Sequence, residues 1–132
     1  MFKKSLLLGV CSGLLAGLGC IIYEMVYKAA MAGVDFSKIV KPVNLVAACV
    51  FGTVLASIGF YLLNKWMKAK GELVFNFIFV ILSFASVTGP FAATLPLDVE
   101  FPELFPGLVV PMHFFPALAW FTLKPLFIKP LN

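Results

Sequence analysis

Three ionisable side chains, Glu24, His113 and Lys124, lie inside long apolar stretches of this sequence and are the residues best placed to carry chemistry. An Asp, Lys or Arg at the centre of a membrane-spanning helix costs roughly 2.5–3.5 kcal/mol on insertion scales, so such groups usually face other helices. His113 is the only histidine, and it stands between Pro111 and Pro116. A carboxylate beside an imidazole can bind a ligand or an ion, or move a proton.

Spacing predicts that Glu24 and His113 meet. Glu24 follows Gly17 by seven residues, which places it within about 20° of the small-residue face of its helix at 100° per residue. Helices that start on opposite sides of the membrane bring Glu24 and His113 to a similar depth, near the outer surface. The predicted ligand-binding residues are Glu24, His113, Thr88 and Asn44. The alternative is a structural contact between helices, with Glu24 reaching to the interface and Lys124 extending to the opposite, cytoplasmic surface.

Other chemistry has little support in the sequence. There is no Ser/His/Asp set, no metal-ligand spacing and no phosphate-binding loop, so no catalytic residue, metal site or cofactor is predicted. Cys11, Cys20 and Cys49 all fall in apolar stretches and are interpreted as small packing residues. The sequence therefore does not indicate an enzyme.

The elements that must position these residues are membrane helices. The chain has 132 residues, of which 62% are hydrophobic and 12% charged, whereas a soluble domain has roughly 25% charged residues. Four apolar runs, at 5–27, 44–64, 73–94 and 108–128, are each long enough as a helix to cross a hydrocarbon core of about 30 Å. Because these runs leave no room for another domain, we predict an all-α, four-transmembrane-helix bundle forming one domain over 1–132.

The start of the chain resembles a secretory signal, and Cys20 suggests a lipoprotein alternative. The apolar run, however, continues to Tyr27, so a retained first span is predicted. All ten basic residues are lysines, and most of them flank the ends that would share a side with the N-terminus. Under the positive-inside rule both termini are predicted to be cytoplasmic. The net charge of +4 is thus a topology signal, and no nucleic-acid partner is predicted.

Small residues and prolines predict how the helices pack and bend. Glycines at four-residue spacing allow close helix approach in a membrane, and the predicted packing residues are Gly9, Gly13, Gly17, Gly52 and Gly89. Pro90 and Pro116 lack the N–H of a helical residue, so each is expected to bend its helix and free a carbonyl. Pro111 is expected in the first turn of the last span. The link at 95–107, with three prolines, is expected to form a non-helical cap.

Two segments, SFASVTGPF at 83–91 and PMHFFPALAW at 111–120, follow a first span that carries a late polar residue. This pattern resembles that of small uncharacterised bacterial four-helix membrane proteins. The residues that match are Gly89, Pro90 and His113. The resemblance implies a four-helix fold in a bacterial inner membrane and no established activity.

Two functions remain open from the sequence. The first is a structural or accessory subunit that packs as a homo-oligomer or within a larger membrane complex, which the small-residue faces favour. The second is a carrier or binding protein for a small apolar ligand or an ion, such as a lipid or a quinone-like molecule, held by the Glu24 and His113 cluster. The fifteen phenylalanines suit an apolar ligand but also suit packing and contact with lipid.

Overall fold

The computed structural model describes residues 1–129, and every regular element in that range is helical. In chain order the elements are α1 (Phe2–Ala30), α2 (Pro42–Met67), the 3-10 turn η1 (Lys68–Lys70), α3 (Gly71–Ser86), α4 (Thr88–Ala92), the 3-10 turn η2 (Pro102–Leu104), α5 (Phe105–Met112) and α6 (Phe115–Phe127). Three helical stretches are long and apolar enough to cross a membrane, namely Phe2–Ala30, Pro42–Ala92 and Pro102–Phe127. The all-helical, membrane-type character predicted from composition is confirmed.

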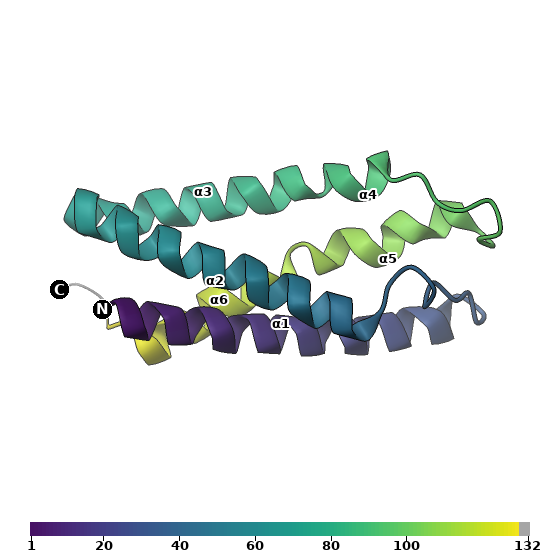
Figure 1. Cartoon of the computed structure of the whole chain (residues 1–132), viewed down its shortest axis with the longest axis horizontal. Helices are drawn as coiled ribbons and strands as arrows, with labels where there is room; N and C mark the ends of the chain where they lie inside the picture. Colours follow the sequence, from purple (N-terminus) through teal and green to yellow (C-terminus); the bar gives the residue numbers. More distant parts are fainter. Residues whose placement is uncertain (130–132) are drawn as a thin grey trace.

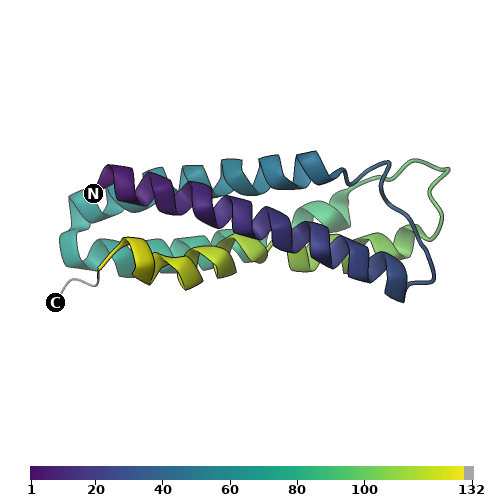
Figure 2. The same ribbon diagram turned by 90° about the horizontal axis from the view of Figure 1, so that it is seen from below.

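The elements lie side by side along one long axis (Figures 1 and 2). α1 runs the length of the molecule and α2 returns beside it; the chain reverses again at η1, and α3 and α4 run outward before α5 and α6 return. The N-terminus, η1 and the end of α6 therefore share one end, which we call the η1 end. The connections 31–41 and 93–101 share the other, which we call the loop end.

The observed helices overlap all of the predicted runs and extend several of them. At the last run, predicted to start at 108, helical structure begins earlier: η2 spans Pro102–Leu104 and α5 begins at Phe105. The expected non-helical cap at 95–107 is therefore wrong in its second half. Pro106 explains the early start, because a proline in the first turn has a helical φ and loses no internal hydrogen bond there.

α1 and α2 form a closed seam along Gly9, Gly13 and Gly17, as their spacing predicted. A Cβ added at Gly13 would lie 2.5 Å from the Cα of Val50, and one added at Gly17 would lie 2.9 Å from the Cα of Val46. Only glycine permits the two backbones to approach this closely. Near the η1 end, the Ser5 hydroxyl donates to the carbonyl of Ser57 at 2.8 Å and joins the same two helices.

An aromatic cluster fills the interior at the η1 end. Phe60 of α2, Phe75 of α3 and Trp120 of α6 are buried and contact one another, with ring centroids 5.1–5.7 Å apart. Centroid separations of about 4.5–7 Å are favourable for aromatic pairs. Lys124 near the end of α6 pairs with Glu72 in the first turn of α3, so α2, α3 and α6 are joined at this end.

Candidate functional site

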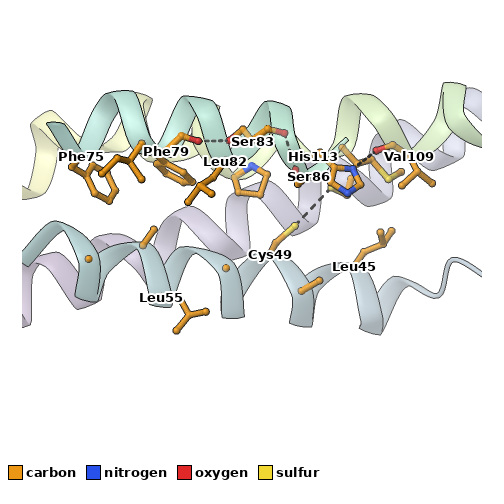
Figure 3. Close-up of a pocket in the computed structure, with 18 of the residues that line it drawn as sticks. Leu45, Cys49, Leu55, Phe75, Phe79, Leu82, Ser83, Ser86, Val109 and His113 are labelled. Atoms are coloured by element: carbon orange, nitrogen blue, oxygen red, sulfur yellow. Dashed lines mark hydrogen bonds between the residues drawn. The ribbon is translucent and has the colours of Figure 1, made fainter. Parts of the chain in front are cut away.

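An apolar groove of about 540 Å³ opens between α2 on one side and α3, α5 and α6 on the other (Figure 3). It begins beside Leu63 and Phe75, next to the aromatic cluster, and extends to Leu45 and Val109 toward the loop end. The volume lies within the roughly 300–1,000 Å³ of typical small-molecule sites. Nearly all of the lining is aliphatic or aromatic, and the polar members are Cys20, Cys49, Ser83, Ser86 and His113.

α2 contributes a wall of small residues to the groove. Gly52 and Gly59 line the groove together with Ala48 and Ala56. A Cβ added at Gly52 or Gly59 would meet no atom within 4 Å, and the same holds at Gly89. Gly52 and Gly89 therefore do not pack against another helix of the described chain: an added Cβ at either would lie in open space, and at Gly52 and Gly59 that space is the groove.

α3 contributes two serines whose hydroxyl hydrogens are already used. The Ser83 hydroxyl donates to the carbonyl of Phe79 at 2.8 Å, and the Ser86 hydroxyl donates to the carbonyl of Ser83 at 2.7 Å. Both bonds are local to the helix, as is common for serine in apolar surroundings. Each serine oxygen can still accept hydrogen bonds through its lone pairs.

His113 lies at the break between α5 and α6 and lines the groove (Figure 3). The predicted bend at Pro116 is present, because helical structure is interrupted at 113–114. There the His113 N–H bonds to the carbonyl of Val110 at 3.2 Å, which leaves the carbonyl of Val109 free to bond the ring Nδ1 at 2.8 Å. Since a carbonyl only accepts, Nδ1 carries the hydrogen, and Nε2 is an acceptor when the ring is neutral.

Prolines add further acceptors beside the groove. Pro116 has no N–H to donate to the carbonyl of Met112, and Pro90 has none for the carbonyl of Ser86. Met112, Ser86 and Pro116 all line the groove. The bend predicted at Pro90 is also present, because a turn at Val87 separates α3 from α4.

Pro111 lies inside α5 and not in the first turn of a span, which corrects the sequence prediction. It removes the donor for the carbonyl of Gly107, and the Tyr23 hydroxyl of α1 donates to that carbonyl at 3.0 Å instead. One turn further along α1, the Tyr27 hydroxyl donates to the carbonyl of Leu104 at 2.7 Å. These two bonds join η2 and α5 to α1.

The predicted partnership of Glu24 and His113 is not found, because no hydrogen bond or ion pair joins them within residues 1–129. Tyr23, and not Glu24, is the residue in this turn of α1 that faces α5 and α6: its hydroxyl donates to the carbonyl of Gly107 and its ring packs against Phe115. Glu24 lies one turn beyond Cys20, toward the loop end. The register that pairs Gly17 with Val46 also carries Glu24 past the start of α2, so no helix of that seam faces it.

The other predicted ligand-binding residues also lie away from the groove. Asn44 is exposed in the first turn of α2, and exposed Thr88 donates its hydroxyl to the carbonyl of Ala85 at 2.7 Å. Of the predicted set, only His113 lines the groove.

Two side-chain pairs were missed from the sequence. The Sγ atoms of Cys20 and Cys49 lie 3.9 Å apart across the seam, and both residues border the groove. Lys124, which was expected to extend to the surface, instead pairs with Glu72, and their side chains are only 16% and 30% exposed. The register of the helices creates both pairs, and no local sequence signal reports that register. No cluster of three or more metal-ligating side chains occurs in residues 1–129.

Comparison with protein-family models, with curated proteins and with solved structures finds no match to this chain. The functional argument therefore depends on the groove itself.

Proposed function

We propose that the chain is a four-span protein of a bacterial inner membrane, with both termini in the cytoplasm. The four spans are α1, α2, α3 with α4, and α5 with α6. Support for the orientation comes from charge: Lys3, Lys4 and the lysines in and beside η1 gather at the η1 end, whereas Asp98, Glu100 and Glu103 lie at the loop end. The positive-inside rule then places the η1 end in the cytoplasm.

Within that membrane, the protein binds a small apolar ligand in the groove between α2 and α3. The observation that carries this proposal is the open wall of α2, where Gly52 and Gly59 leave space that larger side chains would fill. Apolar walls with a few polar groups are typical of small-molecule binding sites. The volume left empty between the helices is what distinguishes the groove from a packing contact.

The test is photolabelling in phosphatidylcholine nanodiscs with a diazirine-bearing hexadecyl methyl ether. We expect saturable labelling of groove residues that an excess of the unlabelled ether suppresses. A Cβ at Gly52 would meet no atom within 4 Å, so Gly52→Leu places its side chain in the groove and should abolish saturable labelling without lowering the thermal unfolding temperature. Gly19→Leu is the matched control, since Gly19 does not line the groove. Labelling that never saturates, or that survives Gly52→Leu, would refute the proposal.

A second candidate is the accessory subunit, as a homo-oligomer or in a larger complex, with a helix of another chain lying in the same groove. The small residues of α2 at four-residue spacing, Ala48, Gly52 and Ala56, favour it because they form a flat face. Native mass spectrometry from nanodiscs separates the candidates. An oligomer that Gly52→Leu dissociates supports assembly through the groove, and a monomer in both proteins supports ligand binding.

A further inference from the structure

The side chains of Ser83, Ser86 and His113, which line the groove, share one property: each has the capacity to accept a hydrogen bond. The hydroxyl hydrogens of Ser83 and Ser86 are donated to backbone carbonyls, and Nδ1–H of His113 is donated to Val109. What remains toward the groove is the acceptor capacity of the two serine oxygens and of Nε2. Met112 and Ser86, whose carbonyls receive no N–H from the prolines four residues further on, line the same groove. An acceptor-rich lining in an apolar medium is satisfied by a ligand that brings a donor.

The lining also restricts the charge of that donor. None of the residues that line the groove is Lys, Arg, Asp or Glu. A carboxylate or phosphate head would find no cation there, and an ammonium head would find no carboxylate. An unpaired charge in such a medium is far more costly than an unpaired neutral group. The complementary head group is therefore neutral.

The arrangement along the groove gives the orientation of the ligand. Between Leu45 and Leu63, α2 follows the groove for roughly 27 Å at 1.5 Å per residue, so 540 Å³ is spread over a long, narrow space. Ser83, Ser86 and His113 line the half toward the loop end, while Phe75, Phe79 and Leu63 line the half toward the η1 end (Figure 3). A chain-like molecule fits with its head beside His113 and its tail toward the aromatic cluster.

We propose that the ligand is a long-chain neutral lipid with a free hydroxyl group, which donates its hydrogen bond to Nε2 of His113. This inference rests on the proposed function and adds the class of ligand to it. The proposal disfavours an oxidised quinone, because the ring oxygens of a quinone are acceptors only. It also disfavours fatty acids and phospholipids, because their head groups are charged. The open side of the groove, between α2 and α3, lets such a lipid enter directly from the bilayer.

The experiment compares two competitors on the same protein. In nanodiscs, the diazirine-bearing ether labels the groove, and unlabelled hexadecanol or hexadecyl methyl ether displaces it. The competitors have the same chain and differ in the hydroxyl hydrogen. We expect hexadecanol to compete about threefold to tenfold more strongly, as the net contribution of one hydrogen bond allows. In His113→Phe, which removes the acceptor and keeps an aromatic ring, the ratio should fall to one. Oxidised decylubiquinone, as a third competitor, should behave like the ether.

Each outcome bears on one claim. Equal competition by alcohol and ether in the unaltered protein overturns the donor inference and leaves the groove as a ligand site. Stronger competition by the quinone overturns it as well, and so does a ratio that persists in His113→Phe. Absence of saturable labelling overturns the proposed function itself. A loss of folded protein in His113→Phe affects both competitors equally, and the ratio in the unaltered protein then decides.

Discussion

The two faces of α2 both carry small residues, but one face packs closely against another helix and the other leaves open space. On one face, Thr53, Ser57 and Cys49 are buried against α1, and Gly13 of α1 lies so close that an added Cβ would touch the backbone of Val50. On the other face, a Cβ added at Gly52 or Gly59 would meet no atom within 4 Å. The first face makes a closed seam and the second makes the wall of a groove.

The difference shows that a small residue in a membrane helix permits close approach without causing it. The seam closes because glycine on α1 lies opposite the α2 backbone along a shared antiparallel register, so both helices gain dispersion contacts. Opposite Gly52, α3 diverges from α2, starting from their junction at η1 (Figure 1). Where no helix packs against the small residues of α2, they leave the empty space of the groove.

The largest expected effect comes from a matched pair of alanine substitutions. Gly13→Ala forces a methyl group against Val50 and Thr53, and we expect the free energy of unfolding to fall by about 1–3 kcal/mol. Gly52→Ala adds a methyl group to empty space and should raise it by about 0.5–1 kcal/mol, because alanine is the better helix former. Thermal and detergent-induced unfolding followed by circular dichroism measures both. Equal effects of the two substitutions would remove the distinction between seam and groove.

The next effect concerns the end where the groove is closed. Glu72→Gln leaves Lys124 with no carboxylate, and we expect a loss of about 1–3 kcal/mol in unfolding free energy, below the roughly 3–5 kcal/mol of a fully buried pair because water still reaches both side chains. The same unfolding assay reports it. The double variant Glu72→Gln with Lys124→Met removes the unpaired charge and should recover most of the loss. If the double variant is no more stable than Glu72→Gln, the pair does not join α3 to α6.

The smallest effect lies at the loop end of the seam. The Lys28 ammonium, with the backbone N–H and hydroxyl of Ser37, lowers the pKa of Asp35 from 3.8 to about 2. Because the folded pKa is depressed, the contribution of Asp35 to stability is present above pH 3.8 and is lost as the pH falls toward about 2. A carbon-detected NMR titration of the Asp35 carboxyl checks this. Lys28→Ala should move the midpoint back toward 3.8, and a midpoint unchanged by that substitution would contradict the assignment.

Much of the fold follows from the sequence because its causes are local. Apolar runs about 21–23 residues long predict helices that cross a membrane, and the observed helices overlap each of the runs. The spacing of Gly9, Gly13 and Gly17 predicts one close-packed face of α1, and that face lies against α2. The bends at Pro90 and Pro116 follow from the missing N–H of proline.

The site was predicted poorly because it depends on register. His113 lines the groove, and Tyr23 rather than Glu24 is the residue of α1 that contacts α5 and α6 at this level. Tyr23, which satisfies the carbonyl freed by Pro111, is 84 residues from its acceptor in the chain, and Glu72 is 52 residues from Lys124. Such pairs follow from how helices slide past one another, which periodicity within a single helix does not report.

Gly71, at the junction of η1 and α3, affects how the width of the groove can change along its length. A Cβ there would lie 2.7 Å from the Cα of Asn64, so the backbones of α2 and α3 cross tightly at this point. A tilt of α3 about this contact displaces each residue of α3 in proportion to its distance from the η1 end. Phe75 is roughly 6 Å from this contact along the helix and Ser83 roughly 18 Å, so a small tilt of α3 moves the wall beside Ser83 about three times as far as the wall at Phe75.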